Sequence, residues 1–259
     1  MTIDRLADRA YLSRQYADDE RLRVRIRTHE LYGENKRPLQ PWVVELLEVR
    51  AGDLLLDVGS GTGRDYHPHL RNTRVIAIDR SLGMLAEVER PRACADAAAL
   101  PFGDAIFDRL MCNHMLYHVP DMSAALREMR RVTRPGGRVV LTANAPGGMR
   151  NLFALYDAAR EQVGLPRVMT VGERFSLGDV DLVRSVFPAT RIEMHQNALV
   201  FPSSAPVLDY LASGPASTDP PELRARMFAT LAMRIDAIIA RDGALRVPKD
   251  AGCFVAEVP

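Results

Sequence analysis

The sequence has few features that would direct it to a membrane or a secretory route. Its N-terminus, MTIDRLADRAYLSRQYADDE, is charged throughout and lacks an apolar signal-peptide core, and no apolar run approaches the length that spans a bilayer. The three cysteines, Cys94, Cys112 and Cys253, lie far apart without the C-x-x-C spacing of a zinc or redox site. We therefore expect a reduced, cytoplasmic protein that does not associate with membranes.

The chain also lacks an excess of charge. Lysine plus arginine number 34 against 33 acidic residues, a net charge of +1, so no overall field attracts nucleic acid. The basic run from Arg21 to Arg27 is explained by a solvated helix face. With 259 residues, 47% of them hydrophobic, and no internal repeat, the chain can build one large core. We expect one domain over residues 1–259.

Three regions differ in pattern. Residues 1–48 have helical spacing, although Leu22, Val24 and Ile26 alternate as in a strand, and we favour a helix there. Residues 49–144 alternate short apolar runs with helical segments, which is typical of a parallel sheet covered on both faces. Residues 145–259 read as insertions and final strands. Their predicted helices lie near 149–163, 177–187 and 221–241, and their predicted strands at 191–201 and 252–258.

A glycine-rich turn follows the first apolar run of the middle region. Leu54 to Val58 leads into Gly59-Ser60-Gly61-Thr62-Gly63, where glycine permits positive φ and close approach of a ligand. The next predicted strand ends in Asp79, which suits hydrogen bonds from ribose hydroxyls. A dinucleotide fingerprint needs its third glycine where Arg64 stands, and a P-loop needs a lysine that is absent. A pyrophosphate or triphosphate ligand is therefore disfavoured.

The segment Asp57-Val58-Gly59-Ser60-Gly61-Thr62-Gly63 resembles motif I of class I S-adenosylmethionine-dependent methyltransferases. Asp79 resembles the ribose acid of motif II, and Asp96-Ala97 the loop that meets the adenine. Residues 113–121 resemble the segment after strand four. With Arg134-Pro135-Gly136-Gly137, these pieces resemble the ubiquinone and menaquinone C-methylase-like (type 11) subgroup. The resemblance implies an α/β fold: a Rossmann-like, doubly wound, seven-stranded, mostly parallel sheet with an N-terminal helical lid (1–48) and C-terminal cap insertions (145–259) around a cofactor-binding core (49–144).

The same resemblance implies S-adenosyl-L-methionine as the cofactor. The residues that it places at the cofactor are Asp57, Gly59, Ser60, Gly61, Gly63, Asp79, Arg80, Met84, Asp96, Ala97, Asn113 and His118, together with Tyr32 from the lid. His29, Tyr11 and Tyr16 are further lid candidates, against the alternative of an exposed helix packed on the sheet edge.

Methyl transfer depends mainly on proximity and alignment, and a base is needed only when the acceptor must lose a proton. His114 follows strand four, so we predict it as the catalytic general base, with a pocket-shaping histidine as the alternative. For His118 a structural hydrogen bond is an alternative to cofactor binding. His67 and His69 flank a proline without further ligands, so we expect surface or cofactor-edge residues and no metal site.

The predicted acceptor is a small, partly apolar or aromatic metabolite. Aromatic residues and methionines of the later insertions are available to line its pocket or to fill a core, and these are Phe153, Tyr156, Phe175, Phe201, Tyr210, Phe228, Met149, Met169 and Met227. An RNA or DNA methyltransferase is the first alternative, but Asn113-His114-Met115-Leu116 replaces the Asn/Asp-Pro-Pro-aromatic motif. A catalytically silent cofactor-binding protein and a nicotinamide oxidoreductase are the others. Nothing in the sequence specifies the acceptor atom or the oligomeric state.

Overall fold

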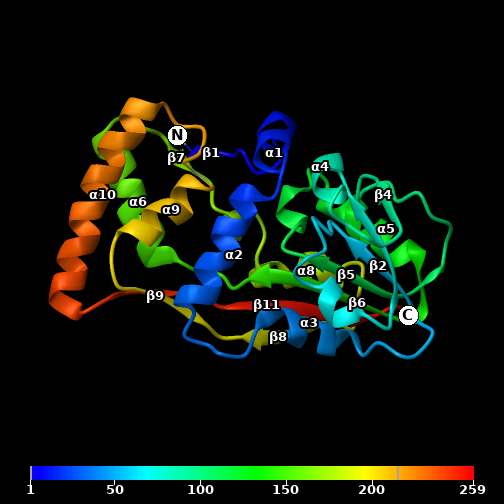
Figure 1. Cartoon of the computed structure of the whole chain (residues 1–259). Helices are drawn as coiled ribbons and strands as arrows, with labels where there is room; N and C mark the ends of the chain where they lie inside the picture. Colours follow the sequence, from blue (N-terminus) through cyan, green and yellow to red (C-terminus); the bar gives the residue numbers. More distant parts are fainter. Residues whose placement is uncertain (1, 215) are drawn as a thin grey trace.

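The fold is built on a twisted seven-stranded sheet with the strand order β4-β3-β2-β5-β6-β11-β8, in a computed structural model that describes residues 2–214 and 216–259 (Figure 1). Neighbouring strands are parallel from β4 to β6, and β11 is antiparallel to both β6 and β8. The strands are β2 (Leu54–Val58), β3 (Arg74–Asp79), β4 (Arg92–Cys94), β5 (Phe107–Asn113), β6 (Thr133–Asn144), β8 (Arg191–His195) and β11 (Ala251–Glu257). The predicted fold class is confirmed.

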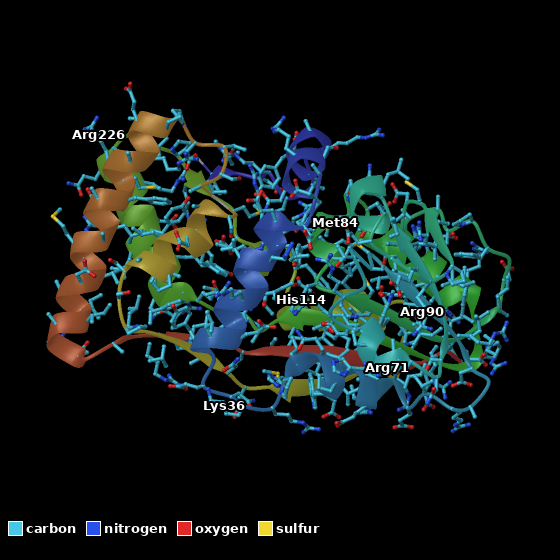
Figure 2. All side chains as sticks on the ribbon, in the orientation of Figure 1. Lys36, Arg71, Met84, Arg90, His114 and Arg226 are labelled. Atoms are coloured by element: carbon cyan, nitrogen blue, oxygen red, sulfur yellow. The ribbon has the colours of Figure 1, made fainter. Side chains whose placement is uncertain are left out.

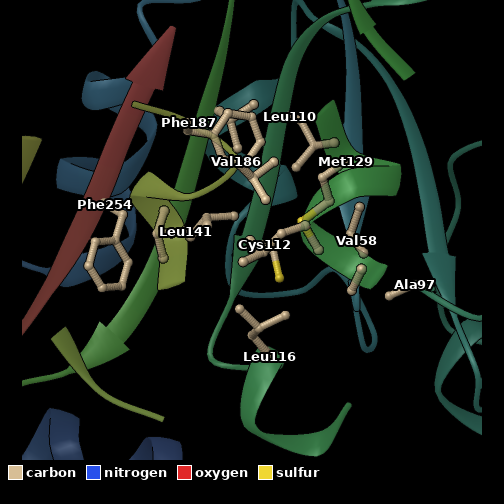
Figure 3. Close-up of a cluster of buried hydrophobic side chains, with 14 of the residues drawn as sticks. Val58, Ala97, Leu110, Cys112, Leu116, Met129, Leu141, Val186, Phe187 and Phe254 are labelled. Carbon is tan, nitrogen blue, oxygen red and sulfur yellow. The ribbon is translucent and has the colours of Figure 1, made fainter. Parts of the chain in front are cut away.

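Apolar strands covered on both faces form the core of this sheet. On one face, helix α5 (Met122–Val132) turns Leu126 and Met129 into a cluster with Leu110 and Cys112 of β5 (Figure 3). The Asp121 carboxylate caps α5 by accepting a hydrogen bond from the Ala124 backbone at 2.8 Å. On the other face, α3 (Leu39–Leu47) packs apolar side chains against β2, β3 and β5. Burial of both faces explains the continuous apolar runs in the sequence.

A helical cap stands beside the sheet and has an apolar cluster of its own. It contains α6 (Arg150–Gln162), α9 (Ala205–Ala212) and α10 (Pro221–Asp242), with the antiparallel pair β9 (Ala198–Phe201) and β10 (Leu245–Pro248). Helix α2 (Glu20–Tyr32) crosses between the cap and the sheet (Figure 1). The ambiguous alternation at residues 22–26 is therefore helical, because α2 lies between two bodies and carries apolar side chains on more than one side.

Shorter elements complete the chain. They are β1 (Thr2–Ile3), which pairs with β7 (Arg167–Val168), α1 (Arg9–Gln15), α4 (Leu82–Leu85), α7 (Val171–Arg174), α8 (Val180–Arg184) and the 3-10 turns η1 (His67–Leu70), η2 (Leu116–His118) and η3 (Leu177–Asp179). Among the described residues, no helix is long and apolar enough to cross a bilayer.

The later insertions differ from the sequence prediction in two places. The single strand expected at 191–201 is wrong, because the chain leaves the main sheet after β8 and enters the cap as β9. Asn197 makes this break: its backbone N–H donates to Asp250, and its side-chain oxygen accepts from Asn35 and Ala198. The helix expected at 177–187 is interrupted, with η3 followed by the short α8. The proline- and serine-rich stretch at 202–206 contains the start of α9, and position 215 lies outside the described residues.

Candidate active site

A cavity of about 1100 Å³ opens at the carboxyl ends of the parallel strands, between the sheet, the N-terminal segment and the cap. This is the edge at which open α/β sheets bind ligands. Figure 2 shows His114 near the middle of the molecule, between Met84 on the sheet side and the cap helices. Most residues that the sequence singled out line this cavity, including Asp57, Gly59, Asp79, Asp96 and Asn113.

The glycine turn after β2 forms one wall. The backbone N–H groups of Gly59 and Ser60 both donate to the Ile78 carbonyl, at 2.8 and 2.9 Å, which holds the turn against β3. Gly59 has a φ of +72°, and a Cβ atom there would lie 2.3 Å from the Met115 side chain. Gly61 has a φ of +57°. Glycine is therefore required at Gly59 both by backbone conformation and by space.

Asp79 ends β3 directly beside this turn. Its Oδ2 accepts from the Gly61 backbone N–H at 2.9 Å, and its Oδ1 accepts from the Ser81 N–H at 2.8 Å. Burial raises the pKa of the Asp79 carboxyl, while the two backbone hydrogen bonds act in the opposite direction. Each oxygen keeps a free lone pair, so the carboxylate can accept further hydrogen bonds from a ligand.

Asp57, at the end of β2, has a protein partner that the sequence analysis missed. Its Oδ2 lies 3.0 Å from His67 Nε2, and both side chains are buried. Burial raises the Asp57 pKa, and the hydrogen bond from His67 lowers it. The expectation that His67 is a surface or cofactor-edge residue is wrong. No sequence motif links these two residues, since the contact depends on the path of the turn after Gly63.

The loop after β4 brings Asp96 and Ala97 to the cavity near Arg80. Arg80 approaches the Asp96 carboxylate at 3.7 Å, and the two side chains are 43% and 44% exposed. Asp96 Oδ1 accepts from the Ala98 N–H at 3.0 Å, leaving its Oδ2 toward Arg80. Met84, on α4, is buried and lines the same wall. These residues form a polar edge over an apolar floor, which suits a purine base.

Asn113 ends β5 with an unpaired donor. Its Oδ1 accepts from the Thr142 hydroxyl at 2.6 Å, whereas its buried Nδ2 has no hydrogen-bond partner among the described residues. Buried polar groups are nearly always paired, and an orphaned amide beside a cavity indicates a ligand acceptor. This is the clearest ligand signal in the site.

His114 follows with a φ of +50°, which is uncommon for a residue other than glycine. Its backbone N–H donates to the Thr142 carbonyl at 3.1 Å, and that bond supports the strained turn. Burial, reinforced by the charge of Lys249, lowers the His114 pKa to about 3. The imidazole is therefore neutral near pH 7, and it is a weak base because effective general bases have a pKa near the working pH.

His118 joins the N-terminal segment to the sheet. Its Nδ1 donates to the Leu6 carbonyl at 2.8 Å, and its Nε2 accepts from the Tyr16 hydroxyl at 2.8 Å. Burial lowers its pKa to about 4. Both ring nitrogens are occupied by protein groups, so the placement favours the structural alternative for His118 over cofactor binding.

The N-terminal segment closes over the glycine turn. The Ser81 hydroxyl donates to the Tyr16 carbonyl at 2.6 Å, and Asp19 pairs with Arg64 at 2.5 Å. Tyr11, Tyr16 and His29 line the cavity. Tyr32 does not: its ring packs on Phe201, 5.1 Å between centroids, as part of the cap cluster. Gly63 is also absent from the lining, because it faces His67. The placement gives no support to Tyr32 or Gly63 as cofactor contacts.

Residues 56–141 match the family model described as "Methyltransferase domain". The match covers the glycine turn, Asp79, Asp96, Asn113 and His114, the residues that meet at the cavity. Over these residues the chain is similar to a methyltransferase domain. Two curated relatives are demethylmenaquinone methyltransferases, from Mycobacterium marinum (42% identical over 99 residues, 37% of this chain and 43% of the relative) and Paenarthrobacter aurescens (40% over 105 residues, 38% and 42%). The chain thus spans less than half the length of these two relatives.

Solved structures share the fold of this chain at low sequence identity. A putative methyltransferase from an antibiotic biosynthesis pathway of Anabaena variabilis has a TM-score of 0.62 at 16% identity, covering 82% of this chain and 94% of that one. The [4+2]-cyclase SpnF has a TM-score of 0.55 at 20% identity, covering 96% of each chain. Because a cyclase has the same fold, the fold alone does not determine the reaction.

Outside residues 56–141, the cap and the N-terminal segment supply the remaining cavity wall. Of the predicted pocket residues, Met149, Phe153, Met169 and Tyr210 line the cavity. Tyr156, Phe175, Phe201, Met227 and Phe228 instead pack in or against the apolar clusters. Several cationic lining residues were not predicted, because no motif surrounds them, and these include Arg25 and Lys249. In the part of the chain that is described, no three potential metal ligands come together.

Proposed function

We propose that this protein transfers a methyl group from S-adenosylmethionine to an O, N or C nucleophile of a small, partly apolar or aromatic acceptor. The observation that carries the proposal is the convergence of the positive-φ glycine turn, the Asp79 carboxylate and the unpaired Asn113 amide on one cavity. The cofactor, when bound, supplies an activated methyl group on a sulfonium. The domain family is the second support.

The residues present fit this cofactor. Gly59 and Gly61 expose backbone at the end of β2, and Asp79 offers lone pairs suited to ribose hydroxyls. Asp96 and Met84 provide a polar edge and an apolar surface for a base. Asn113 Nδ2 is a hydrogen-bond donor without a partner among the described residues, so it can donate to the cofactor. In this proposal the protein binds, aligns and excludes water, which is most of what such a displacement requires.

The acceptor is proposed to be a quinol-like aromatic. The cap wall contains Phe153 and Tyr210 with two methionines, which suits a flat apolar ring. Relatives named demethylmenaquinone methyltransferases support the same class of compound. The sequence-based expectations of a cytoplasmic location, no metal, no membrane or nucleic-acid partner, and a lid made by residues 1–48 remain part of this proposal.

The test is a transfer assay with S-adenosylmethionine labelled in the methyl group. Purified protein is incubated with a panel of hydroquinones and naphthols, and labelled product is separated from the cofactor. We expect label in at least one aromatic acceptor and none with the Asp79→Ala variant. S-adenosylhomocysteine binding without transfer across the panel would favour a silent binding protein. Transfer to bulk RNA would contradict a small acceptor.

A further inference from the structure

Lys249 occupies the acceptor side of the cavity, in the short connection between β10 and β11. Its backbone N–H donates to the Asn197 carbonyl at 2.9 Å, and this bond holds the connection in place. Its Nζ donates to Asn144 Oδ1 at 3.2 Å, at the carboxyl end of β6. The adjacent strand β5 ends in Asn113, and His114 bonds to Thr142 of β6. The ammonium group therefore lies at the sheet edge where the reacting groups must meet.

Among the described residues, this ammonium has no counter-ion. Within residues 2–214 and 216–259, Lys249 forms no ion pair, and its only side-chain hydrogen bond is to the neutral Asn144 amide. The adjacent carboxylate, Asp250, accepts from the Asn197 N–H instead. An ammonium has three N–H donors, so two remain unused. Removal from solvent lowers the Lys249 pKa to about 8, which leaves it mostly charged near neutral pH.

The charged groups that line the cavity around Lys249 are positive, and Asp250 is not among the lining residues. The positive charge of Lys249 contributes to the lowered pKa of both His114 and His29, and Arg25 acts on His29 in the same direction. Arg25 donates to the Ser213 carbonyl at 2.7 Å and, in the described chain, makes no ion pair. The acidic lining residues lie elsewhere: Asp57, Asp79 and Asp96 are in the cofactor half, and Glu30 acts on Asp65. A partly buried cation without an ion-pair partner is costly, so this side of the cavity favours an anion.

We propose that Lys249 binds an ionised oxygen of the methyl acceptor, so that the acceptor enters the site as a phenolate-type anion. This inference rests on the proposed function and specifies its substrate class. The acceptor loses its proton to solvent before binding. Its ionised oxygen then accepts hydrogen bonds from the two unused N–H groups of Lys249. The negative charge that the ammonium stabilises also makes the ring oxygen and its ortho carbons more nucleophilic. For transfer to the ionised oxygen, the neutral His114 then has no proton to remove and serves to position the ring. Transfer to an ortho carbon still releases the proton of that carbon to solvent.

The experiment compares two probes with S-adenosylhomocysteine present. The first is 4-nitrophenol, which absorbs visible light strongly only as the anion, and the second is its uncharged methyl ether, 4-nitroanisole. At about pH 7.5, most Lys249 side chains are ammonium ions. We expect Lys249→Met to weaken phenolate binding roughly 10- to 100-fold and to leave ether binding nearly unchanged, because one charge-assisted hydrogen-bond donor is removed. Lys249→Arg keeps the positive charge and should restore most of the preference for the phenolate over the ether.

Spectroscopy and a matched variant separate this role from a structural one. The visible absorbance gives the pKa of the bound nitrophenol, which should be lower in the parent than in Lys249→Met. Arg241→Met removes an exposed cation near the end of α10 that pairs with Asp242 and does not line the cavity, and it should leave both probes unaffected. A parent protein without preference for the phenolate, or a Lys249→Met variant that keeps the preference, overturns the inference. Failure of the parent to bind S-adenosylhomocysteine would instead refute the proposed function.

Discussion

Asp79→Ala tests the cofactor half of the site most directly. The substitution removes a carboxylate that accepts one hydrogen bond from the glycine turn and one from the start of α4. The remaining lone pairs of the two carboxylate oxygens are proposed to accept hydrogen bonds from the ribose hydroxyls. The variant therefore loses both the ligand contacts and one tether of the Gly61 backbone.

The expected loss of affinity follows from the charge of the acceptor group. Hydrogen bonds to a charged group contribute about 1.5–3 kcal/mol, so the dissociation constant for S-adenosylhomocysteine should rise roughly 10- to 150-fold. Asp79→Asn keeps the size of the side chain and one acceptor oxygen. It should therefore show a smaller loss than Asp79→Ala.

Isothermal titration calorimetry with S-adenosylhomocysteine measures both variants, and a thermal melt of each confirms that the sheet remains folded. An Asp79→Ala protein that folds normally and binds as tightly as the parent would refute the placement of the ribose at Asp79. It would also remove the main physical reason for assigning this edge of the sheet to the cofactor.

Three further outcomes are expected. Gly59→Ala should cost about 1–3 kcal/mol more in urea unfolding than Gly52→Ala, because both positions have positive φ but only Gly59 would clash with a neighbouring side chain; equal losses would contradict this reasoning. His118 has a folded-state pKa of about 4 against an ordinary 6.5, so the unfolded state takes up its proton first, and stability is lost as pH falls below about 6.5. Between pH 7 and 5 the parent should therefore lose about 1–2 kcal/mol more stability than His118→Phe. Equal losses of unfolding free energy in the two proteins would contradict this prediction. Tyr16→Phe should weaken S-adenosylhomocysteine binding about 2- to 10-fold by releasing the segment over the site, whereas Tyr11→Phe, which loses only a 3.4 Å bond to a carbonyl, should change it little; the reverse order in calorimetry would exclude the tether.

The sheet could be predicted from the sequence because its signals are local. The run Leu54 to Val58 is apolar and leads directly into glycines, and the helix capped by Asp121 has its apolar residues on one face. The break at Asn197 could not be predicted, since nothing in that stretch marks the bonds to Asp250 and Asn35 that divert the chain. The fold class can thus be predicted from the pattern of apolar residues along the chain. Which segments form strands in the cap depends on contacts between residues far apart in the sequence.

The site shows the same distinction. The positions of Asp79, Asp96 and Asn113 at one cavity follow from their places after parallel strands, which end at a common edge. The pairing of Asp57 with His67 and the approach of Lys249 to Asn144 join residues whose proximity no motif records. Tyr32 was placed at the cofactor from its local composition, but packing against Phe201 determines its position.

The two halves of the cavity come from different parts of the chain. The turn, carboxylates and amide proposed for the cofactor lie in one uninterrupted stretch from Asp57 to Asn113, whereas the opposite wall is assembled from both ends of the polypeptide. Substitutions, insertions and recombination at either end can therefore alter which acceptor is taken without changing the cofactor stretch. Under the proposed function, acceptor preference is therefore free to diverge while the cofactor stays the same.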